Sequence, residues 1–435
     1  MIRLRAVVSA LAILCCTSGA FGQLFNGRLV TSFYAWEQYD TIGVSSTILR
    51  AYQLAQLSVA YGDFSVHTYL QGAVNGTSDF GDMGIVRAYN LYARWSNIAR
   101  LLDVNVGRQA VYAGVGTGSI DGMLLRGRFL ENRLVVTAYG GATVPTDFRG
   151  VQNNWSENYN IGGQVLLRTK EGLRLGASYM NRHMEREQYE TLRTRDTTFA
   201  AYPYQIAPDS RAEQYLSGEA SYAFRDAFRL YGRYDYDLNF NRTSRLEGGA
   251  RVNLTSRLSL LADYFYRVPH VAYNSIFSAF VANSMSEIEG GVEYAFLPRV
   301  RAFARLAWVA YQGDNSTRWT VGLNNAYGSL SYSGSSGYAG ELQSLSAWGT
   351  YPVLKNVLVP SLGVSYASYR YSTADERQNA LSVLLGTSIR PFRTVWFDVQ
   401  GQWLTNRVYA GDMRVQAKLT YWFSERLSGS RKEGE

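Results

Sequence analysis

Residues 228–238 read FRLYGRYDYDL, and side chains of opposite character alternate along this stretch without a break. One face carries Phe228, Leu230, Gly232, Tyr234, Tyr236 and Leu238. The other face carries Arg229, Tyr231, Arg233, Asp235 and Asp237. Because successive side chains of a strand point to opposite faces, this pattern predicts a β-strand with one apolar and one polar surface.

The same alternating unit recurs at residues 245–254, 287–296 and 300–308, with short polar turns nearby. An antiparallel sheet in a soluble protein also alternates, but its apolar face must then join a protein core. Strands of about ten residues, with aromatic residues toward their ends, are typical of a barrel with lipid outside and water inside. No apolar run of roughly 18 residues, enough for a membrane-spanning helix, follows residue 22. We therefore expect strands to cross the membrane.

The predicted fold class is all-β, a transmembrane, antiparallel, up-and-down β-barrel with no plug domain. The alternating runs indicate about 20–22 strands, or about 18 if two weak N-terminal runs are loops. Short turns such as 225–227 should face the periplasm, and the long connections should face outward. The longest of these, Glu185 to Arg211, is expected to be either a constriction of the lumen or a surface lid.

The first segment, residues 1–22, is a predicted signal peptide. A basic start precedes an apolar run, and Ala20-Phe21-Gly22 forms a cleavage site of small-x-small type. The barrel is then expected to span residues 23–423, with the closing strand ending at Phe423 and a polar C-terminal tail over 424–435. Both cysteines of the chain lie in the signal peptide, so the exported protein would contain no disulfide.

The formal net charge of +8 and the pI of about 9.3 raise the question of an anionic partner. A nucleic-acid surface requires clustered positive charge, whereas the arginines here are spread singly beside Asp and Glu. We expect no nucleic-acid partner; outer-membrane lipid and small hydrophilic solutes are the expected partners. The sequence leaves open a periplasmic partner and the formation of a homo-oligomer.

No catalytic or metal-binding pattern emerges, so we expect no enzyme activity, no cofactor and no metal. The three histidines, His67, His183 and His270, fall on different hairpins without ligand spacing. Serines are abundant, as in 331–336, which we assign to a loop, but none lies in a nucleophile motif.

Charged residues on the polar faces of five consecutive strands form the predicted pore lining. Opposite charges on neighbouring strands can pair across the ladder, and rings of charge can also set the selectivity of a water-filled pore. The predicted set is Arg229, Arg233, Asp235, Asp237, Glu247, Arg251, Asp263, Arg267, Glu289, Glu293, Arg301 and Arg305. Within it, Arg301 and Arg305 are the expected arginines without full partners.

With this barrel pattern the chain resembles bacterial outer-membrane porins. More particularly, Gly107-Arg108-Gln109, then Gly114, Gly116 and Gly118, then Ile120-Asp121-Gly122 resemble a hairpin of alginate-export-type barrels. The resemblance implies that Arg108 and Asp121 contact either a substrate or a loop. It also implies an outer-membrane pore of a Gram-negative-type envelope, through which small hydrophilic solutes diffuse. The alternatives are a scaffold barrel for a secretion or electron-transfer partner and, after that, an outer-membrane enzyme.

Overall fold

The computed structural model describes residues 23–41, 44–76, 85–150, 152–185, 188–194, 199–206, 212–269, 283–311, 313–408 and 411–427. The predicted signal peptide, His270 and residues 428–435 of the predicted tail lie outside the described residues, so those assignments stay predictions.

The described chain forms a 22-stranded antiparallel sheet and a separate two-stranded sheet of β10 and β11. The first twelve strands are β1 (Gln23–Thr41), β2 (Val44–Tyr61), β3 (Phe64–Asn75), β4 (Ile85–Ile98), β5 (Leu102–Ala113), β6 (Gly116–Phe129), β7 (Leu134–Thr143), β8 (Asn158–Arg168), β9 (Leu173–Met184), β10 (Tyr189–Thr194), β11 (Ala201–Ile206) and β12 (Glu213–Phe224). The others are β13 (Phe228–Asp237), β14 (Arg242–Asn253), β15 (Leu258–Arg267), β16 (Met285–Leu297), β17 (Val300–Tyr311), β18 (Asp314–Asn325), β19 (Gly328–Gly337), β20 (Gly340–Thr350), β21 (Leu358–Arg370), β22 (Gln378–Phe392), β23 (Val395–Thr405) and β24 (Asp412–Leu427), with a short 3-10 helix, η2 (Leu354–Asn356), before β21.

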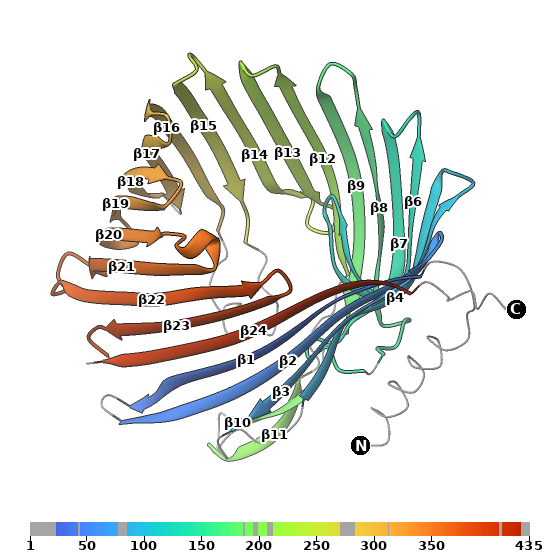
Figure 1. Ribbon diagram of the computed structural model, residues 1–435, viewed down its shortest axis with the longest axis horizontal. Helices are drawn as coiled ribbons and strands as arrows, with labels where there is room; N and C mark the ends of the chain where they lie inside the picture. The colour runs from blue at the N-terminus through green and yellow to red at the C-terminus, as the bar shows by residue number, and fades with distance from the viewer. Residues whose placement is uncertain are drawn as a thin grey trace, which may run out of the picture.

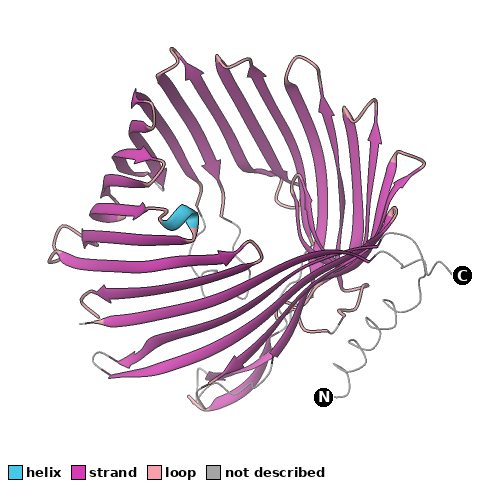
Figure 2. Cartoon of the chain, in the orientation of Figure 1, coloured by secondary structure: helices cyan, strands magenta, loops and turns pink. Residues whose placement is uncertain are grey.

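The sheet closes on itself because the first strand pairs with the last. β1 and β24 run antiparallel from Gln23 opposite Leu427 to Ala35 opposite Val415, and the closed ring of strands is visible in Figures 1 and 2. Closure gives both edge strands a hydrogen-bonding partner, which a sheet in hydrocarbon requires. In the described part of the chain, every strand except β10 and β11 belongs to this barrel.

The structure confirms the barrel and fixes the strand number at the upper end of the predicted range. The alternative of about 18 strands is wrong, because the N-terminal runs all form strands of the barrel, among them the long β1 and β2. The assignment of 331–336 to a loop is also wrong, because these serines lie in β19. The closing strand β24 extends past Phe423 to Leu427, where it pairs with the start of β1.

The two ends of the barrel differ in their connections. At one end, turns such as 62–63, 225–227 and 298–299 are short, and we call this the short-turn end. At the other end lie longer connections, including 144–157 and the segment between β9 and β12. The structure thus has the asymmetry of turn lengths on which the prediction rests, and the periplasmic position of the short turns stays a prediction.

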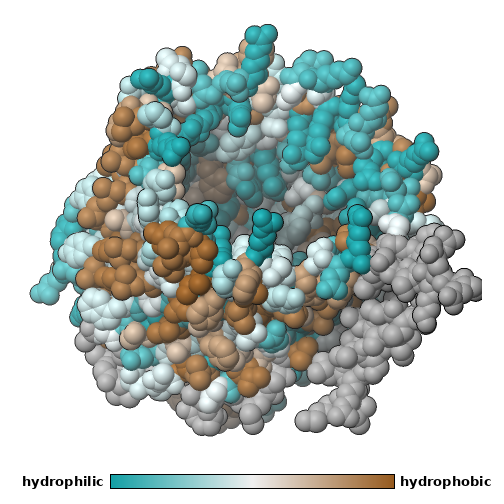
Figure 3. Space-filling view, in the orientation of Figure 1, coloured by the Kyte–Doolittle hydropathy of each residue, from teal (hydrophilic) through white to brown (hydrophobic). Residues whose placement is uncertain are grey.

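The two faces of the wall follow the alternation in the sequence. Leu306 and Trp308 on β17 are 59% and 56% exposed on the outer face, whereas Ala307 between them is 1% exposed. Arg305, on the same face as Ala307, forms an ion pair with Glu289 of β16. In Figure 3, hydrophobic side chains cover much of the outer wall, and hydrophilic side chains surround a central hollow.

No helix in the described residues is long and apolar enough to cross a membrane.

We predict that Leu306→Arg blocks assembly, because an arginine at mid-depth on the lipid face costs about 2–4 kcal/mol. Arg305→Leu is the matched control on the lumen face. It should still assemble, since Glu289 keeps Arg318 and Glu293 keeps Arg251 as ion-pair partners. Heat-modifiable gel mobility measures assembly, and equal tolerance of the two substitutions would contradict the assigned faces.

Candidate functional site

One hairpin of the wall bends into the lumen. It consists of residues 108–121, the facing ends of β5 and β6, and we call it the inward hairpin. At its tip, the Val115 backbone N–H donates to Ser178 Oγ of β9 at 2.9 Å. Ser178 stands opposite Ser217 of β12, and Ser217 stands opposite Asp235 of β13, so the three side chains lie on the same face of the sheet. The tip therefore lies against the lumen side of strands that are not its neighbours in the ladder.

Alternating glycines allow the tip to approach the wall this closely. A Cβ on Gly114 would overlap Ser178 Oγ, and a Cβ on Gly116 would overlap the Tyr139 hydroxyl. Gly118 has a φ of +133°, which residues with a side chain rarely adopt. The glycine-rich stretch recognised in the sequence is thus the surface by which the inward hairpin packs on β7 and β9.

The wall stays continuous where β5 departs from it. The pairing of β4 with β5 ends at Arg108, and Gly107 beside it has a φ of +125°. Beyond that point the Ala88 N–H of β4 donates to the Phe148 carbonyl at 2.8 Å. The loop 144–157 therefore supplies the backbone partner that the bent strand withdraws.

Arg108 and Asp121 hold this junction together. Arg108 Nε and Nη2 each donate to a different Asp121 carboxylate oxygen at 2.7 Å. Arg108 Nη1 donates to the Arg149 carbonyl of the loop at 2.8 Å. The side chains are only 8% and 13% exposed, and arginine's planar fork suits this bidentate geometry. The pair thus joins the inward hairpin to the loop, and contact with a solute stays a prediction.

A small buried cluster lies beneath the inward hairpin, formed by Val111, Ala113, Ile120, Leu124 and Tyr139. Val111, Ala113 and Ile120 are completely buried. Apolar side chains packed in this way hold the hairpin against the wall, because lifting it would expose them to water in the lumen.

The aromatic ring at the hairpin tip faces open space. Tyr112 is 79% exposed and borders a cavity of about 680 Å³. The lining of that cavity also includes Arg126 of β6, Arg168 of β8 and Arg174 of β9, and Arg174 pairs with Glu219 of β12. The inward hairpin therefore narrows the lumen beside a group of arginines.

The predicted pore lining forms a wall of ion pairs on the lumen side of β13–β18, which we call the charged wall. Its ion pairs are Arg233 Nε to Asp235 at 2.9 Å, Arg251 Nη2 to Glu293 at 2.7 Å, Arg305 Nη1 to Glu289 at 3.2 Å and Arg305 Nη2 to Glu293 at 3.7 Å, with a further pair between Arg245 and Glu247. Asp263 accepts a hydrogen bond from the Tyr231 hydroxyl at 3.3 Å.

Four members of the predicted set have other surroundings. Asp237 is 3% exposed and accepts hydrogen bonds from the backbone N–H groups of Asn239 and Phe240, so it stabilises a turn. The Arg267 guanidinium lies over the Phe265 ring at 5.8 Å. Arg229 and Arg301 have no ion pair within the described residues.

The structure corrects the expectation for Arg305, which is fully partnered by two carboxylates. It also adds residues that the predicted set omitted, notably Arg318 of β18, which pairs with Glu287 and Glu289. Arg318 and Glu287 both occupy polar-face positions in the sequence, but only the register between strands reveals that they meet.

A second part of the lumen carries hydroxyl groups in place of charge. Ser333 of β19 is within 2.8 Å of Ser344 of β20, hydroxyl to hydroxyl, and Ser346 of β20 is within 3.3 Å of Ser365 of β21. We call the lumen face of β19–β21 the hydroxyl wall. The serine at every second position of 329–335 was the signal in the sequence for this face.

The long segment 185–211 contains the separate hairpin of β10 and β11. Arg193 lies over the Tyr204 ring within this hairpin, at 4.1 Å. At its base, the neighbouring carboxyl of Glu157 raises the pKa of Glu185. Several of the charged residues that drew attention to this segment lie outside the described residues, so its role as constriction or lid stays a prediction.

The two described histidines are held in separate environments. His67 Nε2 is 2.8 Å from Ser65 Oγ and its ring stacks on Tyr92, while His183 stacks on Tyr159. Among the residues the structure describes, no three His, Cys, Asp or Glu side chains lie close enough to hold a metal ion.

No protein-family model and no curated protein matches this sequence. Solved structures do match. The ferric enterobactin receptor PfeA, in complex with BCV-L6, is 10% identical with a TM-score of 0.53, over 94% of this chain and 82% of that chain. The E. coli P pilus tip assembly intermediate PapC-PapD-PapK-PapG is 11% identical with a TM-score of 0.50, over 95% and 62%. Pseudomonas aeruginosa OpdK with vanillate is 11% identical with a TM-score of 0.43, over 92% and 99%.

At these identities the likeness concerns the fold alone. The chain has a fold of the outer-membrane β-barrel type.

We predict that Asp121→Asn destabilises the barrel by about 3–5 kcal/mol, because it leaves the Arg108 charge buried without its partner. The matched control is Glu131→Gln, which removes a surface pair with Arg133 in which Glu131 is 86% exposed, so the change should be about 0–1 kcal/mol. The loss of heat-modifiable mobility with urea concentration measures both variants. Similar midpoints for the two would contradict the structural role of Arg108 and Asp121.

Proposed function

We propose that this protein is an outer-membrane pore through which small hydrophilic solutes diffuse, and that the inward hairpin forms its constriction. The single observation that supports this most is a closed barrel with a polar interior, narrowed by a hairpin that packs on the inner wall. In this proposal residues 1–22 direct export, and the short turns face the periplasm.

The lining residues support passage of water and polar solutes. The charged wall pairs most of its arginines with carboxylates, and the hydroxyl wall presents neutral donors and acceptors. Most of this surface stays hydrated without binding one type of ion strongly, which is what diffusion requires. The hairpin lies over β7–β9, so solutes would pass between Tyr112 and the remaining wall.

The alternative is a scaffold barrel for a secretion or electron-transfer partner, and a conductance measurement distinguishes it from a pore. Stable ohmic steps in planar bilayers favour the pore. A barrel that inserts but stays silent favours the scaffold.

The constriction can be tested at Tyr112. The only cysteines of the chain, Cys15 and Cys16, precede the barrel, so Tyr112→Cys introduces a single reactive thiol after cleavage of the predicted signal peptide. A bulky, charged methanethiosulfonate reagent should then lower single-channel conductance, because it adds volume at the narrowest part of the lumen.

The control is Leu130→Cys, at a turn residue that is 66% exposed, compared with 79% for Tyr112. Labelling there should leave conductance unchanged. If deletion of β10 and β11 raises conductance while labelling of Tyr112→Cys does nothing, the constriction lies in the 185–211 segment and the assignment to the inward hairpin is wrong.

A further inference from the structure

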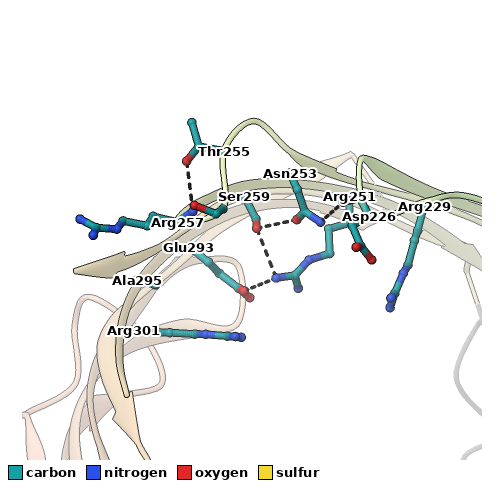
Figure 4. A pocket seen from close by; sticks show the side chains of 11 residues that line it. Asp226, Arg229, Arg251, Asn253, Thr255, Arg257, Ser259, Glu293, Ala295 and Arg301 are labelled. Carbon is teal, nitrogen blue, oxygen red and sulfur yellow. Dashed lines mark hydrogen bonds and ion pairs between the residues drawn. The ribbon is translucent and has the colours of Figure 1, made fainter. Parts of the chain in front are cut away.

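A cavity at the short-turn end of the charged wall is lined by two guanidinium groups that form no ion pair within the described residues. It has a volume of about 700 Å³ and is bordered by residues of β13 to β17. Figure 4 shows Arg229 and Arg301 extending from different strands toward the space beside the Arg251–Glu293 ion pair. Because this cavity opens in the lumen, a solute in the pore would reach it.

The carboxylates present do not neutralise these arginines. Glu293 already binds Arg251 at 2.7 Å and lies 3.7 Å from Arg305. Asp226 lies at the edge of the cavity, but it forms no ion pair with Arg229 or Arg301 in the described structure. Two guanidinium groups therefore face the cavity with all their charge available.

The register places like charges side by side at this position. Arg229 of β13 stands directly opposite Arg251 of β14, and like charges in opposed positions of a ladder are destabilising. Arg305 and Arg318 of the charged wall, in contrast, have carboxylate partners. An anion bound between the strands would offset the repulsion between Arg229 and Arg251 that the protein's own carboxylates do not fully neutralise.

Hydroxyl groups also border the cavity. Thr255 Oγ1 accepts hydrogen bonds from the backbone N–H groups of Arg257 and Leu258, so its own hydroxyl hydrogen remains to donate. Ser256 adds a second hydroxyl to the same border. Arginine forks and hydroxyls together are the groups that bind the oxygens of phosphate-type anions.

We propose that this cavity binds a divalent oxyanion of the phosphate type, with Arg229 and Arg301 as the binding residues. A divalent ligand matches two unpaired guanidiniums, and the cavity volume is within the range of small-molecule sites, about 300–1,000 Å³. A phosphate carried on a small organic group would therefore fit. This inference deepens the proposed pore function. Binding of the anion does not depend on that function, whereas its passage through the lumen does.

The test uses inorganic phosphate at about pH 8, where its second proton is largely lost. In planar bilayers with potassium chloride, phosphate should reduce chloride conductance in a saturable manner, because it occupies the arginines that chloride would pass. Arg229→Gln with Arg301→Gln should weaken this inhibition about tenfold or more, since charge-assisted hydrogen bonds are lost. Higher salt should weaken the inhibition of the wild-type pore by screening.

The matched control is Arg257→Gln. Arg257 borders the same cavity, but its side chain turns away from Arg251 and Glu293 in Figure 4, so the inhibition constant should change little. An unchanged constant in the double variant, or an equal loss in Arg257→Gln, would overturn the site. Neither Arg229 nor Arg301 has an ion-pair partner in the described chain, so the double variant should still assemble.

Binding is measured separately from conductance, by equilibrium dialysis of labelled phosphate against the folded barrel in detergent. Binding to wild type that the double variant loses, in a barrel that conducts no current, would support the site and refute the pore. Currents with no difference in phosphate binding or inhibition between wild type and the double variant would refute the site and leave the pore standing.

Discussion

The whole structure depends on one requirement, that each backbone N–H and C=O in the membrane finds a partner within the protein. Water is absent from hydrocarbon, so an unpaired strand edge there costs several kcal/mol for each group. The pairing of β1 with β24 removes the edges of the barrel. The same requirement explains the loop 144–157, whose Phe148 carbonyl accepts the Ala88 N–H that β5 leaves without a partner.

This local exchange of partners is what permits a strand hairpin to enter the lumen. Gly107 and Gly118 adopt positive φ angles, and the buried Arg108–Asp121 pair joins the hairpin to the loop. The apolar cluster around Ile120 then keeps the hairpin on the wall. The same contacts therefore hold the inward hairpin in the lumen and keep the wall continuous. Arg108 and Asp121, which the sequence suggested as substrate contacts, stabilise the structure.

The pairing of charges in the lumen changes along the barrel axis. Near mid-height, Arg305 and Arg318 share Glu289, and the wall is close to neutral. At the short-turn end, Arg229 and Arg301 have no carboxylate partner within the described residues, although they sit in a polar cavity. A solute in the lumen at that end would therefore meet positive charge that no described carboxylate pairs, and low-dielectric walls focus the field of such charge.

The sequence by itself determined the barrel class, the lipid and lumen faces and most strand positions, because period-two alternation is a local property that each strand carries alone. It also indicated the pore-lining charges of 228–305. Only the tertiary structure decided which charges pair, since Arg318 of β18 meets Glu289 of β16 across the intervening strand β17, where the registers of two hairpins bring both residues level with Ala307. The inward course of 108–121, the hydroxyl wall at β19 and the unpaired state of Arg301 likewise depend on which strands become neighbours. These strands are mostly consecutive in the chain, but the register within each hairpin arises only when two strands pair, and no single strand encodes it.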